Sequence, residues 1–257
     1  MELDQLAVEI ATARANRGLL EPPSHRWSAF SIEDGYAVAR LLHERRLAEG
    51  ARPVGLKLGF TNRAVWEAAG LTSPFWSPIY DDSITNAPEL SLDAFVLPRI
   101  EPEIVLGFRS ALDRDASVDE ISAALGWAAP GFEIGQCHYP EWIMSPVDAI
   151  ADAGLHGILV LGEKVPGPIG SDSLAFTRVV LKRPDEIMAR GSDTDALGDP
   201  IAAVAWLLRL PGVEGLLADS IVTTGTLTAA SSIAADETWE MRCSGPIPLG
   251  RLEISLL

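Results

Sequence analysis

Cysteine is scarce in this chain, which has two among its 257 residues, Cys137 and Cys243. Their spacing forms neither a disulfide framework nor a cysteine zinc site, and it fits a reducing cytosol. No apolar run approaches the roughly 18 residues needed to cross a bilayer. The acidic start Met1-Glu2-Leu3-Asp4 does not have the form of a secretion signal. We therefore expect a cytoplasmic protein with no membrane partner.

Positive charge is also in short supply, because 20 lysines and arginines face 36 acidic residues and leave a net charge of −16. Such a field repels phosphate backbones, which excludes nucleic acid as a partner. It also repels small anionic substrates at long range. A site for such a substrate must then supply its own positive charge from a metal, a lysine or backbone N–H groups.

The first 50 residues have helical periodicity. Apolar residues at helical spacing predict a helix over 3–17, and a second helix begins at Ser31, which has Asp34 in the capping-box position, and ends at Gly50. From Pro53 the pattern changes to period two, which is typical of a strand. We interpret 1–50 as an N-terminal helical subdomain or arm and 51–257 as a mixed-β catalytic domain.

Later segments alternate between strand and helix signals. Ser117 and Glu120 form a second capping box, which opens a helix that we expect to end at Pro130, and Asp199-Pro200 begins another. Residues 72–82 show no regular period and are interpreted as a long functional loop. Strands are predicted over 155–161, 176–182, 220–224, 238–243 and 252–255. The fold class is therefore α+β, with a rolled or barrel-like mixed sheet as its core.

An acidic strand carries the strongest functional signal. In the run Arg99–Leu106, Glu101 and Glu103 share one face about 7 Å apart, and Glu133 has a similar setting between apolar residues and glycines. Carboxylates gathered on a buried face need protons or a cation to neutralise them. Oxygen ligands of this kind suit Mg²⁺ or Mn²⁺, with Ca²⁺ a weaker candidate. The alternative is a strand whose glutamates face solvent.

Lys57 is the second candidate, on a strand face shared with Gly55 and Gly59. Those glycines predict open space around the ammonium, which could bind a carboxylate or stabilise an enolate. Asp82 closes the segment 72–82 and could act as a general base or hold Lys57 or a water. The alternatives are a surface lysine and a turn-forming aspartate.

Thr224 and Gly225 follow an apolar strand and could offer O–H and N–H donors to a substrate carboxylate, or form an ordinary turn. The four histidines lack metal-ligand spacing, and His156 is the one that we expect in the wall of a site. Thr224, Gly225 and His156 are our candidate substrate-binding groups.

Together these residues resemble the 2-keto-4-pentenoate hydratases (2-hydroxypenta-2,4-dienoate hydratases) of the fumarylacetoacetate hydrolase superfamily. The resemblance is carried by the runs 54–61 and 99–104 with Asp82 and Glu133, and by later landmarks at 189–192, 197–200 and 224–225. It implies a metal triad of Glu101, Glu103 and Glu133, with Lys57 and Asp82 as the polar pair over the metal. It also implies a mixed-β roll, a homo-oligomer, and addition of water to a 2-hydroxy-2,4-dienoate, giving a 4-hydroxy-2-oxo acid in aromatic meta-cleavage catabolism.

The chain departs from this family's common Asp-Asn-Ala-Ser-Ser-Gly stretch, where it has Asp152-Ala153-Gly154-Leu155-His156-Gly157. Other reactions on the same site stay open: a 2-oxo acid decarboxylase of the 4-oxalocrotonate type, or an acylpyruvate C–C hydrolase, which would favour a His–Glu pair near the metal. A catalytically silent relative that binds a keto acid or serves as an assembly partner is the non-enzyme alternative.

Overall fold

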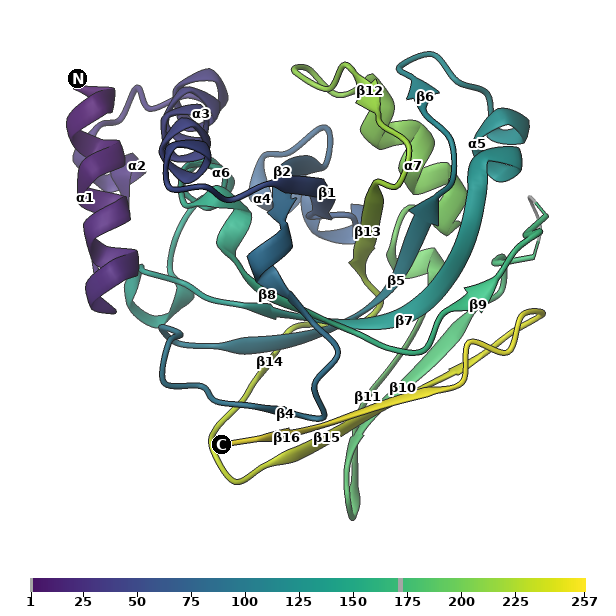
Figure 1. The fold of residues 1–257 in the computed structure, drawn as a ribbon. Coiled ribbons are helices and arrows are strands. Elements are labelled where there is room, and N and C mark those ends of the chain that lie inside the picture. Colours follow the sequence, from purple (N-terminus) through teal and green to yellow (C-terminus); the bar gives the residue numbers. More distant parts are fainter. Residues whose placement is uncertain (1, 171–172) are drawn as a thin grey trace.

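Two β-sheets pack against each other in the computed structural model, which describes residues 2–170 and 173–257. The larger sheet has the strand order β2-β1-β13-β5-β7-β8-β3 and curls into an open cup (Figure 1). Two short strands, β14 and β9, extend it by pairing with β5 and β7. Its strands are β1 Pro53–Gly59, β2 Phe75–Tyr80, β3 Ile84–Thr85, β5 Arg99–Phe108, β7 Leu125–Gly135, β8 His156–Leu161, β9 Val165–Pro166, β13 Ile221–Thr226 and β14 Ser231–Ser232.

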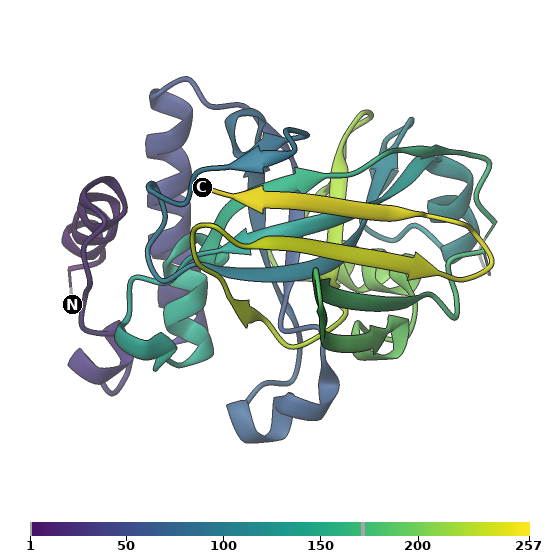
Figure 2. The ribbon, with the colours of Figure 1, turned by 90° about the horizontal axis from the view of Figure 1, so that it is seen from below.

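The second sheet covers the outer face of the cup and has the order β11-β10-β15-β16-β4. Figure 2 views the molecule from the side of this sheet, with the yellow strands β15 and β16 crossing the front. The strands are β4 Glu89–Leu90, β10 Arg178–Arg183, β11 Glu186–Ser192, β15 Thr238–Ser244 and β16 Arg251–Leu256, and a separate pair joins β6 Leu112–Asp113 to β12 Gly215–Leu216.

Helices flank the cup on two sides (Figure 1). The group on one side comprises α1 Leu3–Asn16, α2 Pro23–Arg26, α3 Ile32–Ala48 and α6 Pro146–Ala151; the other side has α5 Val118–Ala124 and α7 Pro200–Arg209, and α4 Trp66–Ala69 is a short turn. The α6 residue Ala151 packs in the same apolar cluster as the N-terminal helices. The helical layer therefore includes α6, which comes from far along the chain. No helix in the described residues is long and apolar enough to cross a membrane.

The main core lies between the two sheets. Alternate residues of the acidic strand, such as Ile100 and Ile104, lie in one apolar cluster with Trp239 and Met241 of the second sheet. Because strand side chains alternate, the intervening residues of the same strand point into the cup. The packing of one face thus determines which residues face the cup interior.

Several predicted boundaries are confirmed: Ser31 and Ser117 cap their helices through capping boxes, and Asp199 accepts bonds from the first turn of α7. Two predictions are wrong. Residues 75–80 form a strand rather than a loop, since Pro78 is tolerated on β2, at the sheet edge. The helix α5 ends at Ala124 rather than at Pro130, because the following residues pair with β5 as β7.

Candidate metal centre

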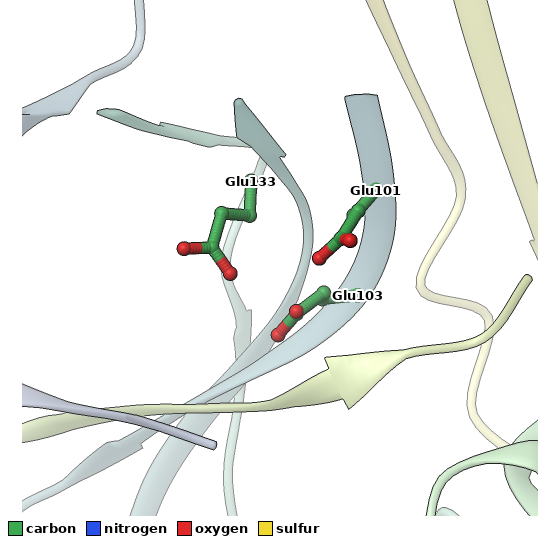
Figure 3. Close-up of side chains that lie close together, drawn as sticks. All are labelled: Glu101, Glu103 and Glu133. Atoms are coloured by element: carbon green, nitrogen blue, oxygen red, sulfur yellow. The ribbon is translucent and has the colours of Figure 1, made fainter. Parts of the chain in front are cut away.

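Three glutamates meet inside the cup because two neighbouring strands are paired in register. Glu101 lies directly opposite Glu133 across the antiparallel pair β5–β7, and Glu103 lies two residues further along β5 on the same face. One carboxylate oxygen from each lies within 4.8 Å of the others. Figure 3 shows the three side chains pointing into a shared space. Glu103 and Glu133 are each 1% exposed, so these are not glutamates on a solvated sheet face.

Lys57 is the cation in direct contact with this cluster. Its Nζ lies 2.6 Å from Glu133 Oε1 and donates a 2.8 Å hydrogen bond to the carbonyl oxygen of Gly154. The side chain is buried, as is that of Glu133. Burial by itself lowers the pKa of an ammonium, but the three nearby carboxylates outweigh that effect and raise the pKa of Lys57. Lys57 therefore keeps its charge inside the cup.

The three acids differ in their proton affinity. Burial, followed by the charge of Glu133, raises the pKa of Glu101 to about 7 and that of Glu103 well above its usual value. Burial also acts on Glu133, but Lys57 and His156 outweigh it and lower its pKa to about 2. Glu133 is thus held charged, whereas Glu101 and Glu103 bind protons more readily than ordinary glutamates unless another positive charge arrives.

The donor set fits a hard divalent cation. Glu103 Oε1 and Glu133 Oε2 are buried and have no hydrogen-bond partner among the described residues. Buried polar atoms without partners are rare and require an explanation, and a bound cation is one that the chemistry supports. Three ionised glutamates and one ammonium sum to two negative charges, which a dication would neutralise. Oxygen donors alone suit Mg²⁺, Mn²⁺ or Ca²⁺ rather than a softer metal.

Gly225 reaches the cluster through its backbone. Its N–H donates a 3.0 Å hydrogen bond to Glu103 Oε2, and its φ of +96° is one that glycine adopts without strain. The neighbouring Thr224 does not reach the cluster, because its hydroxyl donates to the carbonyl of Ile104. The prediction of paired N–H and O–H donors is thus wrong for Thr224, whose hydroxyl bonds the backbone of β5 instead.

His156 lies against the triad with both ring nitrogens engaged. Nδ1 is 2.9 Å from Glu133 Oε1, and Nε2 is 3.0 Å from the hydroxyl of Ser83. The structure therefore contains the His–Glu pair for which sequence spacing offers no sign. With neither nitrogen free, His156 holds Glu133 in place and forms part of the wall, and it has no ring nitrogen left to accept a proton from water.

Asp82 does not join the site. Its carboxylate is exposed and receives bonds of 2.5 and 2.7 Å from Arg46 of α3. The prediction of a polar pair of Lys57 and Asp82 is therefore wrong in this structure. The reason is local: the 3-10 turn Asp81–Ser83 places Ser83 inward, against His156, and turns Asp82 toward the helix.

The glycines beside Lys57 do not leave open space around it. A Cβ at Gly55 would lie 2.1 Å from the carbonyl oxygen of Ile221, and one at Gly59 would lie 2.3 Å from the ring of Phe75. These glycines allow a neighbouring strand and an aromatic ring to approach closely. The prediction of open space beside Lys57 is therefore wrong, because the protein's own groups fill it.

Two hydroxyls near the triad were not among the predicted site residues. Thr61 Oγ1 lies against Gly225, and Thr223 stands beside Lys57 in the parallel pair β1–β13; both hydroxyls are buried and lack a partner within the described residues. Thr61 does not cap the turn that follows it, because Asn62 has that role. In the sequence, the one indication of a role for Thr61 is that it lies two residues after the strand that carries Lys57.

Known proteins resemble this chain over most of its length, although no protein-family model matches it. It is 30% identical over 218 residues to the TodF product hydratase of Pseudomonas putida, covering 83% of this chain and 81% of that one. It is 29% identical over 219 residues to a 2-keto-4-pentenoate hydratase of Paraburkholderia xenovorans, covering 84% and 81%. A 4-oxalocrotonate decarboxylase of a Pseudomonas species is 29% identical over 236 residues and 91% of each chain.

Solved structures share the fold. A 4-oxalocrotonate decarboxylase from Pseudomonas putida, complexed with magnesium and adipate, superposes with a TM-score of 0.90 over 99% of this chain and 97% of that one, at 23% identity. A fumarylpyruvate hydrolase from Pseudomonas aeruginosa, with Mn²⁺ and pyruvate, gives 0.62 over 80% and 89%, at 14% identity. From its sequence relatives, the chain belongs to the 2-keto-4-pentenoate hydratase family.

Proposed function

We propose that this protein is a metal-dependent hydro-lyase that adds water to a 2-hydroxy-2,4-dienoate and gives a 4-hydroxy-2-oxo acid in aromatic meta-cleavage catabolism. The observation that carries the proposal is the buried cluster of Glu101, Glu103 and Glu133 with Lys57 in contact. An acidic protein with a net charge of −16 needs local positive charge to hold an anionic substrate. Lys57 supplies one such charge, and a metal ion held by the three glutamates would supply the other. Hydratase relatives support the reaction.

We infer that Glu101, Glu103 and Glu133 hold Mg²⁺, or Mn²⁺ in its place. The bound ion would supply Lewis-acid stabilisation of the negative charge that develops on the substrate's oxygens. The relatives' complexes with magnesium and manganese support a divalent ion of this kind. Oxygen-only donors and a site that needs two positive charges support it independently.

The residues of the chain then have distinct roles. Lys57 provides a fixed positive charge for an enolate oxygen, and its bond to Gly154 sets where that charge stands. Gly225 N–H and His156 orient Glu103 and Glu133. The unpartnered hydroxyls of Thr61 and Thr223 are donors available to a substrate oxygen or a water.

The proposed function is tested by turnover of 2-hydroxypenta-2,4-dienoate with added Mg²⁺, comparing wild type with Glu101→Gln. Loss of one carboxylate ligand should weaken metal binding and turnover together, each by about 10-fold or more. Glu253→Gln is the matched control, since Glu253 is an exposed acid on β16. Calorimetric titration of Mg²⁺ and product analysis give the two readouts. Normal metal affinity and turnover in Glu101→Gln would reject the triad.

Decarboxylation of a 2-oxo acid is the second candidate, because a 4-oxalocrotonate decarboxylase is as similar to this chain as the hydratases are. Both reactions require stabilisation of an enolate, so the triad and Lys57 serve either. Release of CO₂ from 4-oxalocrotonate, compared with water addition to the dienoate, distinguishes them. The C–C hydrolase is disfavoured, since both ring nitrogens of His156 are occupied.

We also propose that the protein works in the cytoplasm as a homo-oligomer. The cytoplasmic location rests on its two free cysteines, Cys137 and Cys243. Light scattering of the purified protein measures the number of subunits, and a single-chain mass would reject the homo-oligomer.

A further inference from the structure

A tight turn over Ala153–Leu155 lies beside the proposed catalytic lysine. Ala153, Gly154 and Leu155 have φ values of +50°, +67° and +59°, so three successive residues adopt the left-handed region. That region is unfavourable for Ala and Leu, because their Cβ atoms crowd the backbone. Strain of this kind persists only where surrounding contacts enforce it, and it concentrates at functional sites.

The turn is fixed by hydrogen bonds to its successive carbonyls. Lys57 Nζ donates to Gly154 O at 2.8 Å, and the Ser77 hydroxyl donates to Ala153 O at 2.9 Å. The backbone of Gln136 bonds Leu155 O. Gly154 O, which accepts the bond from Lys57, therefore lies in the middle of a turn whose three carbonyls are all hydrogen-bonded. A shift of the turn would move this acceptor away from the ammonium.

Both ends of the turn are held by one side chain from the first helix. Arg14 of α1 donates to Asp152 Oδ1 at 2.9 Å and to the carbonyl oxygen of His156 at 2.7 Å. Asp152 is wholly buried and also bonds His138 Nδ1 at 2.7 Å. The planar guanidinium can bridge two acceptors in fixed geometry, which a lysine cannot reproduce.

We propose that Arg14 is a positioning residue for the active site: it clamps the turn from Asp152 to His156 so that Gly154 O holds Lys57 at the working distance from Glu133. The N-terminal helix then contributes to catalysis without touching substrate. The role in turnover rests on the proposed function; the effect on Lys57 itself does not.

The test compares Arg14→Lys and Arg14→Gln with wild type in saturating Mg²⁺. Lys57 is followed by acetylation with an amine-reactive ester and peptide mass spectrometry, with the exposed Lys164 as the internal reference. Releasing the clamp should raise the labelling of Lys57 by about 10-fold relative to Lys164. In the hydration assay at saturating Mg²⁺, kcat should fall by about 10-fold with KM nearly unchanged, because the geometry of Lys57 is altered.

Arg40→Lys is the matched control, since Arg40 forms an exposed ion pair with Glu44 on α3 and should behave as wild type in every readout. Wild-type labelling and kcat in folded Arg14 variants would overturn the proposal, as would a lower melting temperature with labelling unchanged. If those variants do not fold, Ser77→Ala removes one bond from the same turn, and unchanged Lys57 labelling there would also overturn it. Wild-type protein that fails to hydrate the dienoate would reject the proposed function, while the labelling would still decide the clamp.

Discussion

At the scale of single residues, the site works because its three carboxylates are not equivalent. Lys57 and His156 both contact Glu133 Oε1, at 2.6 and 2.9 Å, and leave its other oxygen without a partner. Glu101 and Glu103 have no such contact with Lys57, and their pKa values rise. A cation that enters must therefore displace protons from two acids while a third is already ionised.

This difference predicts that metal affinity depends on pH. The pKa of Glu101 is raised to about 7 in the metal-free protein and that of Glu103 is raised as well, so Mg²⁺ binding should weaken by about 10-fold or more per pH unit below pH 7 and release at least about one proton per ion. Calorimetry at about pH 6 in buffers of different ionisation enthalpy measures the protons released. Binding without proton release at that pH would contradict the shift.

The same shift affects stability with a definite sign. Because the folded-state pKa of Glu101 lies above the ordinary glutamate value of 4.5, the folded protein binds more protons, and the metal-free protein should lose stability as pH rises from about 4.5 to about 7. Added Mg²⁺ should remove that loss. Urea unfolding at the two ends of this range, with EDTA or with Mg²⁺, gives the comparison.

A third residue-scale prediction concerns Lys57→Met, which keeps the length of the side chain and removes its charge. Turnover should fall by about 100-fold or more, because the fixed charge near the developing enolate is lost. Mg²⁺ should bind more tightly, since the ammonium 2.6 Å from Glu133 no longer repels it. Opposite changes in turnover and affinity are the expected signature. Weaker Mg²⁺ binding would show that Lys57 mainly shapes the site.

Sequence reasoning found the residues whose type is unusual for a buried strand. Glu101, Glu103, Glu133 and Lys57 stand out because charged residues in apolar strands are uncommon, and the structure brings all four together. Asp82 was misplaced, because the rotation of a 3-10 turn is not encoded in residue type. Backbone donors and acceptors such as Gly154 O have no sequence signature.

At the scale of elements, Gly225 joins strand β13 to the metal cluster. A Cβ there would lie 2.1 Å from the Thr61 hydroxyl, while Gly250, with a φ of +78°, has nothing within 4 Å of its Cβ position. Each Gly→Ala change should lower the free energy of unfolding by about 1–2 kcal/mol, because alanine is unfavourable at a positive φ. Gly225→Ala should cost at least about 2 kcal/mol more, since it displaces Thr61 and the bond to Glu103. Urea unfolding of both variants tests this, and equal losses would contradict the contact.

Elements were predicted well where pattern and capping agree, as in α1 and α3, and less well where tertiary pairing decided. Strand β2 contains Pro78 and has no clean alternation, yet it pairs with β1 at the sheet edge. Pro102 lies in the middle of β5, where its missing N–H faces the break between β13 and β14 and its carbonyl accepts from Leu227. Such tolerance depends on which neighbours are present, and that information lies outside the local sequence.

At the scale of the whole molecule, the net charge of −16 opposes the approach of an anionic substrate. Raising the ionic strength from about 10 to about 150 mM shortens the Debye length to about 8 Å and screens the exposed charges. We therefore expect KM for the dienoate to fall with added KCl at saturating Mg²⁺, with kcat unchanged. Initial-rate measurements across this range provide the test. A KM that rises throughout would mean that attraction at the site outweighs the field of the surface.

The direct opposition of Glu101 and Glu133 across β5 and β7 limits how natural variants of this protein can differ in length. One added or deleted residue within either strand would turn the downstream side chains to the opposite face, burying acids among the core isoleucines and dismantling the site at once. The exposed connection Pro184-Asp185 between β10 and β11 carries no such constraint. Insertions and deletions that evolution has tolerated should therefore concentrate in that connection and avoid 99–108 and 125–135.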